Sequence, residues 1–130
     1  MPDNNPAQVL ILEDEPFIAM DLRFAFEDAG VEAYTASTCD QAMALIEQQA
    51  IDVAVLDVNL GNGETCEDVA FTLRNSGKPF ALHTGDLDRA GEYLRKMKAP
   101  IIAKPTPADR VVEQILALLP PPPEAKRASG

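Results

Sequence analysis

Short apolar runs alternate with longer amphipathic stretches along this chain, and the alternation limits the folds that it can adopt. Five of the runs have the length and the residue types of buried strands, and they cover residues 9–12, 31–36, 53–56, 80–83 and 101–103. The stretches between and after them have the length of helices. Strands that alternate with helices form parallel sheets with right-handed crossovers and with helices on both faces. The sequence therefore predicts an α/β fold, a flavodoxin-like (βα)5 doubly wound sheet of five parallel strands in the order 2-1-3-4-5.

Turn and capping residues mark the ends of the expected helices. Pro16 lies in the first turn of the first helix, where proline is tolerated, and Ser37 with Asp40 makes an approximate capping box for the second. Four consecutive prolines stop the last helix after Leu119. We expect one folded domain over residues 9–119. Residues 1–8 are expected to be a disordered N-terminus, and residues 120–130 a disordered proline-rich tail.

The composition of the chain excludes some classes of partner. The formal net charge of −10 at pH 7 argues against binding to nucleic acid, whose phosphates attract Lys and Arg, and against anionic membrane surfaces. No apolar run approaches the ~18 residues of a membrane span, and the first residues lack the features of a secretory signal. Cys39 and Cys66 have the spacing of neither a metal site nor a redox motif. We therefore expect a cytoplasmic protein with two reduced, structural thiols.

Charged and polar side chains stand at the ends of four predicted strands. Glu13 and Asp14 follow the first strand and Asp57 follows the third, whereas Thr84 and Lys104 stand at the ends of the fourth and fifth. The carboxyl ends of parallel strands meet at one edge of a sheet, and ligands bind there between strands one and three, so we expect these side chains to lie together. Crowded carboxylates raise one another's pKa unless a cation shares the site. Carboxylate oxygens suit Mg²⁺ best.

The same residues are the groups that phosphoryl transfer requires. Asp57 is a carboxylate nucleophile, while Mg²⁺ and the ammonium group of Lys104 can neutralise charge on the phosphoryl oxygens. Taken singly, Asp57 could be a turn or capping aspartate, and Glu13 and Asp14 could cap the following helix. The combination of all these strand ends favours the chemistry over the separate structural roles.

Four motifs make the chain resemble the receiver domains of bacterial two-component response regulators. They are VLILEDE, VAVLDVNLGNG, FALHTGD and IIAKP, in the family's order and roughly its spacing, and the resemblance covers residues 9 to about 119. It implies that Asp57 is the phosphoacceptor, that Asp14 binds Mg²⁺ directly and that Glu13 acts on the metal through water. It also implies that the backbone carbonyl of Asn59 binds the metal. The hydroxyl of Thr84 and the ammonium group of Lys104 would contact the phosphoryl group, and Pro105 would follow a cis peptide bond.

The resemblance also implies a function and partners. A sensor histidine kinase or a phosphotransfer protein would pass phosphate to Asp57 in a Mg²⁺-dependent step. Phosphorylation would then switch binding to an unknown downstream protein, or make the chain a phosphate sink in a relay. We expect a stand-alone, monomeric receiver that is not an enzyme, although it assists its own phosphorylation and dephosphorylation. Two alternatives stay open, namely a pseudo-receiver that binds partners without phosphate and an aspartyl-phosphate phosphohydrolase, whose DxD motif residues 57–59 loosely match.

Three positions near the expected site depart from the usual pattern of the family. Ile101 stands where response regulators carry Phe or Tyr, so the coupling in which an aromatic ring swings inward cannot operate in its usual form. The segment PFALHTGD resembles a variant of the subgroup with a Phe-Ala-Thr-Gly motif, with Leu82 and His83 replacing the strict residues. Membership would imply a partner kinase of the type common in alphaproteobacteria. Because His83 lies in a predicted buried strand, we expect a packed or rim histidine rather than a phosphoryl carrier.

The first predicted helix has two apolar stripes. The stripe expected to face the core consists of Ile18, Leu22, Ala25, Phe26 and Ala29. Phe17, Met20 and Phe24 form the other, over a quarter-turn away. Since one helix against one sheet cannot bury both, we hypothesise that the second stripe docks the helical bundle of the kinase beside Asp57. Burial beneath a neighbouring loop is the alternative.

The stretch over residues 87–98 has a thin apolar stripe. It contains Gly91, which costs a helix about 1 kcal/mol relative to Ala. We predict a marginal helix that responds to phosphorylation and forms the output surface.

Overall fold

The strands of this chain form one parallel sheet in its computed structural model. The structure describes residues 6–61, 64–85 and 96–120. The strands are β1 (Gln8–Leu12), β2 (Glu32–Ala36), β3 (Val53–Asp57), β4 (Phe80–Thr84) and β5 (Ile101–Ala103). Their order is β2-β1-β3-β4-β5, and every neighbouring pair is parallel. This confirms the predicted flavodoxin-like α/β fold. β1 begins at Gln8, one residue earlier than expected, where the Gln8 N–H donates a hydrogen bond to Asp52 Oδ2.

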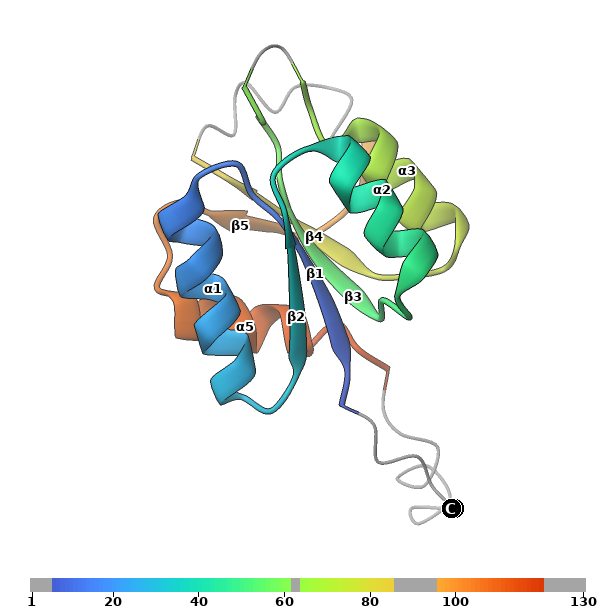
Figure 1. The fold of residues 1–130 in the computed structure, drawn as a ribbon. Helices are drawn as coiled ribbons and strands as arrows, with labels where there is room; N and C mark the ends of the chain where they lie inside the picture. The colour runs from blue at the N-terminus through green and yellow to red at the C-terminus, as the bar shows by residue number, and fades with distance from the viewer. Residues whose placement is uncertain (1–5, 62–63, 86–95, 121–130) are drawn as a thin grey trace, which may run out of the picture.

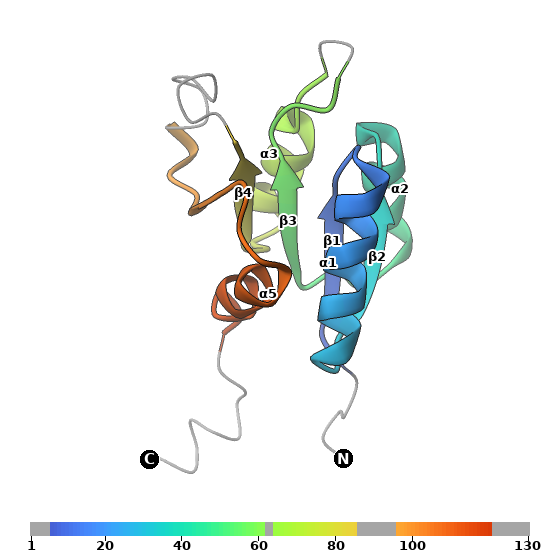
Figure 2. The same cartoon turned by 90° about the vertical axis from the view of Figure 1, so that its left-hand side faces the viewer.

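Helices cover both faces of the sheet (Figures 1 and 2). One face carries α1 (Pro16–Asp28) and α5 (Ala108–Leu116), and the other carries α2 (Cys39–Gln48) and α3 (Glu67–Asn75). Within the described ranges, no helix combines the length and the apolar character needed to cross a bilayer. The helix expected over residues 87–98 falls mostly outside the described residues, as do most of the expected N-terminal segment and the proline-rich tail.

The sheet divides the core into two layers because successive strand residues point to opposite faces. Leu10 and Leu12 of β1 pack with the α2 and α3 side, whereas Val9 and Ile11 pack with the α1 and α5 side. β1, β3 and β4 are buried almost throughout, which explains why their sequences read as continuous apolar runs.

The two stripes of α1 have different environments. Leu22 and Phe26 of the first stripe are buried against the sheet, and Ile18 and Ala25 are partly buried beside them. Ala29 of that stripe is exposed, contrary to expectation, because the helix ends at Asp28 and its backbone turns away there. The second stripe is left in solvent, with exposed fractions of 78%, 45% and 56% for Phe17, Met20 and Phe24.

Two helix ends differ from the expected ones. The N-cap of α2 is Thr38, whose hydroxyl accepts a hydrogen bond from the Gln41 N–H, and Gln41 Oε1 accepts one from the Ser37 N–H. The expected capping box of Ser37 with Asp40 is therefore wrong by one position, and the pair is Thr38 with Gln41. The longer glutamine side chain reaches the backbone N–H before the helix, for which aspartate is too short. α5 ends at Leu116 and the chain continues in a turn, before the prolines are reached.

Both cysteines are free and buried. Burial, followed by the charge of Glu64, raises the pKa of Cys39 to about 11, and burial, followed by Cys39, raises that of Cys66 to about 12. Both thiols therefore stay protonated at neutral pH, which makes them poor nucleophiles and agrees with a structural role.

A matched pair of substitutions on α1 tests the assignment of its two stripes. We expect Phe26→Ala to lower the free energy of unfolding by roughly 3–5 kcal/mol, because it leaves a cavity between α1 and the sheet. Phe24→Ala, on the exposed stripe of the same helix, is expected to change it by less than about 1 kcal/mol. Urea unfolding of both variants measures the difference, and equal losses would contradict the described packing.

Candidate functional site at the carboxyl edge of the sheet

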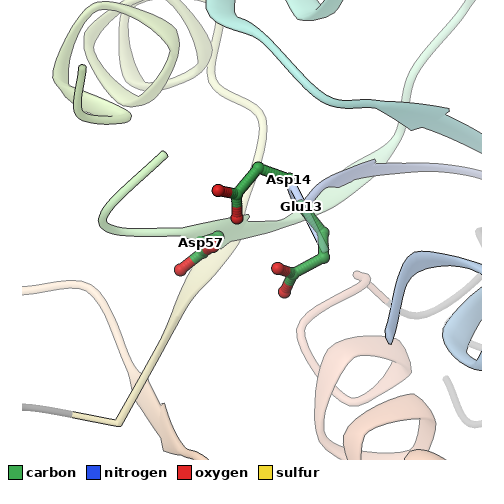
Figure 3. Close-up of side chains that lie close together, drawn as sticks. All are labelled: Glu13, Asp14 and Asp57. Atoms are coloured by element: carbon green, nitrogen blue, oxygen red, sulfur yellow. The ribbon is translucent and has the colours of Figure 1, made fainter. Parts of the chain in front are cut away.

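Three acidic side chains meet where β1 and β3 end. Glu13 and Asp14 directly follow β1, and Asp57 is the last residue of β3, the parallel neighbour that pairs Leu12 with Leu56. One oxygen from each of the three carboxylates lies within 4.8 Å of the others. Figure 3 shows the Asp14 and Asp57 carboxylates facing each other, with that of Glu13 alongside. The convergence of these three carboxylates, expected from the sequence, is therefore present.

Lys104 brings a positive charge into this acidic cluster. Its Nζ lies 2.9 Å from Glu13 Oε1 and 3.3 Å from Asp57 Oδ1. The backbone holds Lys104 at the edge of the sheet, because its N–H donates a hydrogen bond to the Thr84 carbonyl at 2.9 Å. The peptide bond between Lys104 and Pro105 is cis. Glu13 and Asp57 are both buried, whereas Asp14 is exposed and open to a ligand from solvent.

The electrostatics of the site are dominated by burial and crowding. Burial, followed by the negative charge of Glu13, raises the pKa of the Asp57 carboxyl to about 7, although Lys104 opposes the change. Burial alone would lower the pKa of Lys104, but its contacts with Glu13 and Asp57 outweigh this effect and raise it. A second cation at the carboxylates would favour their charged forms, so the site is suited to bind one.

A local bridge orders the loop after β3. Asn59 and Thr65 form an antiparallel bridge whose hydrogen bonds run from Leu60 N–H to the Glu64 carbonyl and from Cys66 N–H to the Val58 carbonyl. In such a pair the backbone groups of the two opposed residues take no part in the ladder. The bridge therefore does not use the carbonyl of Asn59.

Gly61 is a site residue that the sequence reasoning missed. Its φ of +81° favours glycine, and a Cβ at this position would lie 3.5 Å from Asp14 Oδ2. The glycine therefore allows the loop to turn close to the carboxylate. The signal was present in the NLGNG motif, where glycine next to asparagine is typical of tight turns.

Thr84 and His83 end β4, between β3 and β5 in the sheet. Both side chains are buried, and Asp57 pairs with His83 in the register of β3 and β4. The burial of His83 agrees with the expectation of a packed or rim residue. Ile101, at the start of β5, has a partly exposed side chain and pairs with Leu82.

A groove runs from the exposed stripe of α1 to the strand ends. It has a volume of about 530 Å³, and its lining includes Phe17, Met20, Phe24, His83, Lys104 and Pro105. We call it the α1 groove. Lys104 belongs both to this groove and to the acidic cluster, so the two features adjoin at its side chain.

Proteins of known family resemble this chain in sequence. A family model described as response regulator receiver domain matches residues 9–116. The probable transcriptional regulatory protein TcrX of Mycobacterium tuberculosis is 33% identical over 122 residues, which make up 90% of this chain and 51% of that protein. The chain spans about half or less of the length of the curated relatives that it matches.

Solved structures also resemble this chain in fold. The solution structure of SdrG from Sphingomonas melonis Fr1 has a TM-score of 0.72 at 37% identity, covering 87% of this chain and 95% of that one. The crystal structure of a CheY-like response regulator receiver domain protein from Methanospirillum hungatei JF-1 has a TM-score of 0.77 at 22% identity, covering 97% and 100% of the two chains. The second likeness concerns the fold alone.

The raised pKa of Asp57 predicts how stability depends on pH in the absence of metal. The pKa is about 7 in the folded chain and close to the ordinary value of about 3.9 in the unfolded one. The stabilising contribution of the protonated carboxyl is therefore complete below about pH 4 and is lost as pH rises through 7.

Asp57→Asn stays neutral at every pH. We therefore expect its advantage in free energy of unfolding over the wild type to grow by about 1–2 kcal/mol as pH rises from 5 to 8, after allowance for solvent screening at the rim. Urea unfolding in a metal chelator measures this gain. A stability difference that does not change with pH would contradict the electrostatic description.

Proposed function

Because this chain belongs to the response regulator receiver domain family, we propose that Asp57 accepts a phosphoryl group from a sensor histidine kinase or a phosphotransfer protein. Phosphorylation then changes which downstream protein the chain binds, or stores phosphate within a relay, and the chain acts in the cytoplasm. The observation that best supports the proposal is the position of Asp57, whose carboxylate lies beside Glu13, Asp14 and Lys104. A receiver of this kind is a phosphoacceptor that assists its own reaction rather than an enzyme.

The acidic cluster fits a divalent cation, and we propose Mg²⁺. The donors would be the carboxylates of Asp14 and Asp57 and the backbone carbonyl of Asn59, all of which are hard oxygen ligands. Glu13 is already paired with Lys104, which suits a role through water rather than direct binding. When bound, Mg²⁺ supplies positive charge that keeps Asp57 ionised and neutralises the phosphoryl oxygens.

The residues of the chain perform the transfer by position and charge. An oxygen of Asp57 attacks the phosphorus in line, and the bond between phosphorus and the donor nitrogen breaks as the new one forms. Lys104 neutralises charge on the transferred group, and its contact with Glu13 orients its ammonium group. Thr84, buried at the end of β4, donates its hydroxyl to a phosphoryl oxygen.

The α1 groove is the docking surface that we propose for the kinase. Phe17, Met20 and Phe24 are exposed on α1, and the groove that they line extends to Lys104. An apolar helix seated there would bring a phosphohistidine close to Asp57. We also propose that the chain belongs to the Phe-Ala-Thr-Gly subgroup, with a switch that does not use an aromatic ring, since Ile101 takes that position.

Phosphorylation by a small donor tests the phosphoacceptor. We expect incubation with Mg²⁺ and acetyl phosphate to add one phosphoryl group to the wild-type chain, measured by intact mass, and to add none to Asp57→Asn. Asp52→Asn is the control, since Asp52 immediately precedes the first residue of β3, and it should leave the modification unchanged. Modification of Asp57→Asn at the wild-type level would exclude Asp57 as the acceptor.

Substitution on the groove tests the docking surface. We expect Met20→Asp to slow phosphotransfer from the kinase at least tenfold, because a charge would be buried in an apolar contact. Phosphorylation by acetyl phosphate should be unaffected. Phe71→Asp is the matched control, since Phe71 is 57% exposed on α3, beyond the other face of the sheet. A wild-type transfer rate in folded Met20→Asp would rule out docking at this surface.

A further inference from the structure

A basic pocket lies at the amino ends of β4 and β5, at the edge of the sheet opposite to Asp57. It has a volume of about 470 Å³. Its charged lining consists of Arg74 in the last turn of α3, Lys78 before β4 and Lys98 before β5, and among the described residues no acidic side chain lines it. We call it the Arg74 pocket. The phosphoacceptor chemistry leaves it without a role, because that chemistry takes place at the carboxyl ends of the strands.

Three cations around one pocket are unexpected in so acidic a chain, which has 21 acidic and 11 basic residues. Within residues 6–61, 64–85 and 96–120, Arg23 and Lys104 are the basic residues that form ion pairs, so none of the three cations of the pocket is paired with a carboxylate. The negative end of α3 favours a cation at Arg74, but it does not require three cations to line one pocket. Their common position therefore indicates an anionic partner.

Arg74 is held in place while it stays accessible. Its Nη2 donates a hydrogen bond to the Met97 carbonyl, and its guanidinium carbon lies 5.8 Å from the centroid of the Phe80 ring. The hydrogen bond uses one of the five N–H donors of the guanidinium, and the residue is exposed, so the other donors are open to a ligand. A side chain that is fixed before binding loses less conformational entropy when it pairs with an anion.

Lys98 adopts a backbone conformation that favours glycine. Its φ of +55° lies in the left-handed region, which is unfavourable for a residue with a Cβ. Glycine or asparagine would form this turn more readily, so the backbone does not explain a lysine here. The turn leads the chain from Met97, which accepts the hydrogen bond of Arg74, into β5. The lysine therefore adds positive charge to the pocket although it disfavours the turn.

We propose that the Arg74 pocket binds a short acidic segment of a partner protein, whose carboxylates pair with Arg74, Lys78 and Lys98. A guanidinium pairs with a carboxylate through two parallel hydrogen bonds, and a lysine ammonium group pairs with it as a point charge. The apolar part of the lining, which includes Pro100 and Leu118, suits an apolar side chain between the acids. The inference does not require Asp57 to be phosphorylated, because the pocket lies at the other edge of the sheet.

The charge around the pocket limits the occupant to a short segment. Salt at physiological concentration confines the attraction of an exposed cation to about 8 Å, so the pocket attracts carboxylates in spite of the net charge of −10. A nucleic acid or an anionic membrane presents charge over a much wider surface, which the acidic remainder of the chain would repel.

Two other occupants fit the pocket less well. Residues 121–130 follow the pocket directly in sequence, but they contain Glu124 against Lys126 and Arg127, so this segment does not complement three cations. A small ligand is usually enclosed by its pocket, whereas all three cations here are exposed. This exposure suits a peptide that lies across the pocket.

Titration of the full chain with a synthetic acidic peptide tests the proposal. The probe is acetyl-Glu-Glu-Leu-Glu-Glu-Leu-amide, and the control probe carries Gln in place of every Glu. Binding to ¹⁵N-labelled protein is followed by ¹H–¹⁵N NMR. We expect the largest shift changes over residues 74–80 and 96–99, and no binding of the neutral peptide. Raising the salt concentration from about 0.05 M to about 0.5 M should weaken binding of the acidic peptide.

Charge reversal separates the pocket from the rest of the surface. We expect Lys78→Glu and Lys98→Glu each to raise the Kd for the acidic peptide about fivefold, because an attraction becomes a repulsion. Arg110→Glu makes the same change of charge at an exposed residue of α5 outside the lining, and should leave the Kd within about twofold of the wild-type value. All three variants change exposed side chains, so the wild-type fold should be retained.

Several results would overturn the proposal. They are shift changes confined to other parts of the chain, equal binding of the neutral peptide, and wild-type affinity in both lysine variants. Tighter binding of inorganic phosphate at the same residues would identify a small-anion site instead of a peptide site. Shift changes at these residues when the chain alone is concentrated would assign the pocket to a second copy, and would equally overturn the acidic partner.

Discussion

Negative charge crowded at the carboxyl ends of β1 and β3 is the constraint on which the rest of the site depends. The parallel pairing of these strands places Glu13, Asp14 and Asp57 together, and burial keeps water from screening Glu13 and Asp57. Lys104 offsets part of the repulsion through its contacts with Glu13 and Asp57. Burial, followed by the remaining excess of negative charge, raises the pKa of Asp57, and that excess suits the cluster to a divalent cation.

Lys104 connects this chemistry to recognition. Its ammonium group contacts the acids, while its side chain also lines the α1 groove beside His83. A partner that fills the groove therefore approaches the reactive carboxylate from the side of α1. The apolar stripe of α1 is exposed in the described structure. Contact with a partner in the α1 groove would bury it.

The sequence was sufficient to predict the fold and the convergence of the site. Continuous apolar runs identified the buried strands, and the geometry of parallel sheets then required Glu13, Asp14, Asp57 and Lys104 to meet. Side-chain pairing could not be predicted, because the contact of Glu13 with Lys104 depends on rotamers and on distances between elements far apart in sequence. The N-cap at Thr38 and the exposure of Ala29 depend on one-residue differences in helix ends, which local propensities do not resolve.

The coupling between Asp57 and a bound cation is tested most directly by carboxyl ¹³C NMR. The Asp57 resonance would be titrated with pH, first in a metal chelator and then with saturating Mg²⁺. The account predicts a pKa of about 7 without metal, and a pKa well below this value when Mg²⁺ stabilises the ionised carboxylate. An ordinary pKa in the chelator, or the same pKa with and without Mg²⁺, would contradict it.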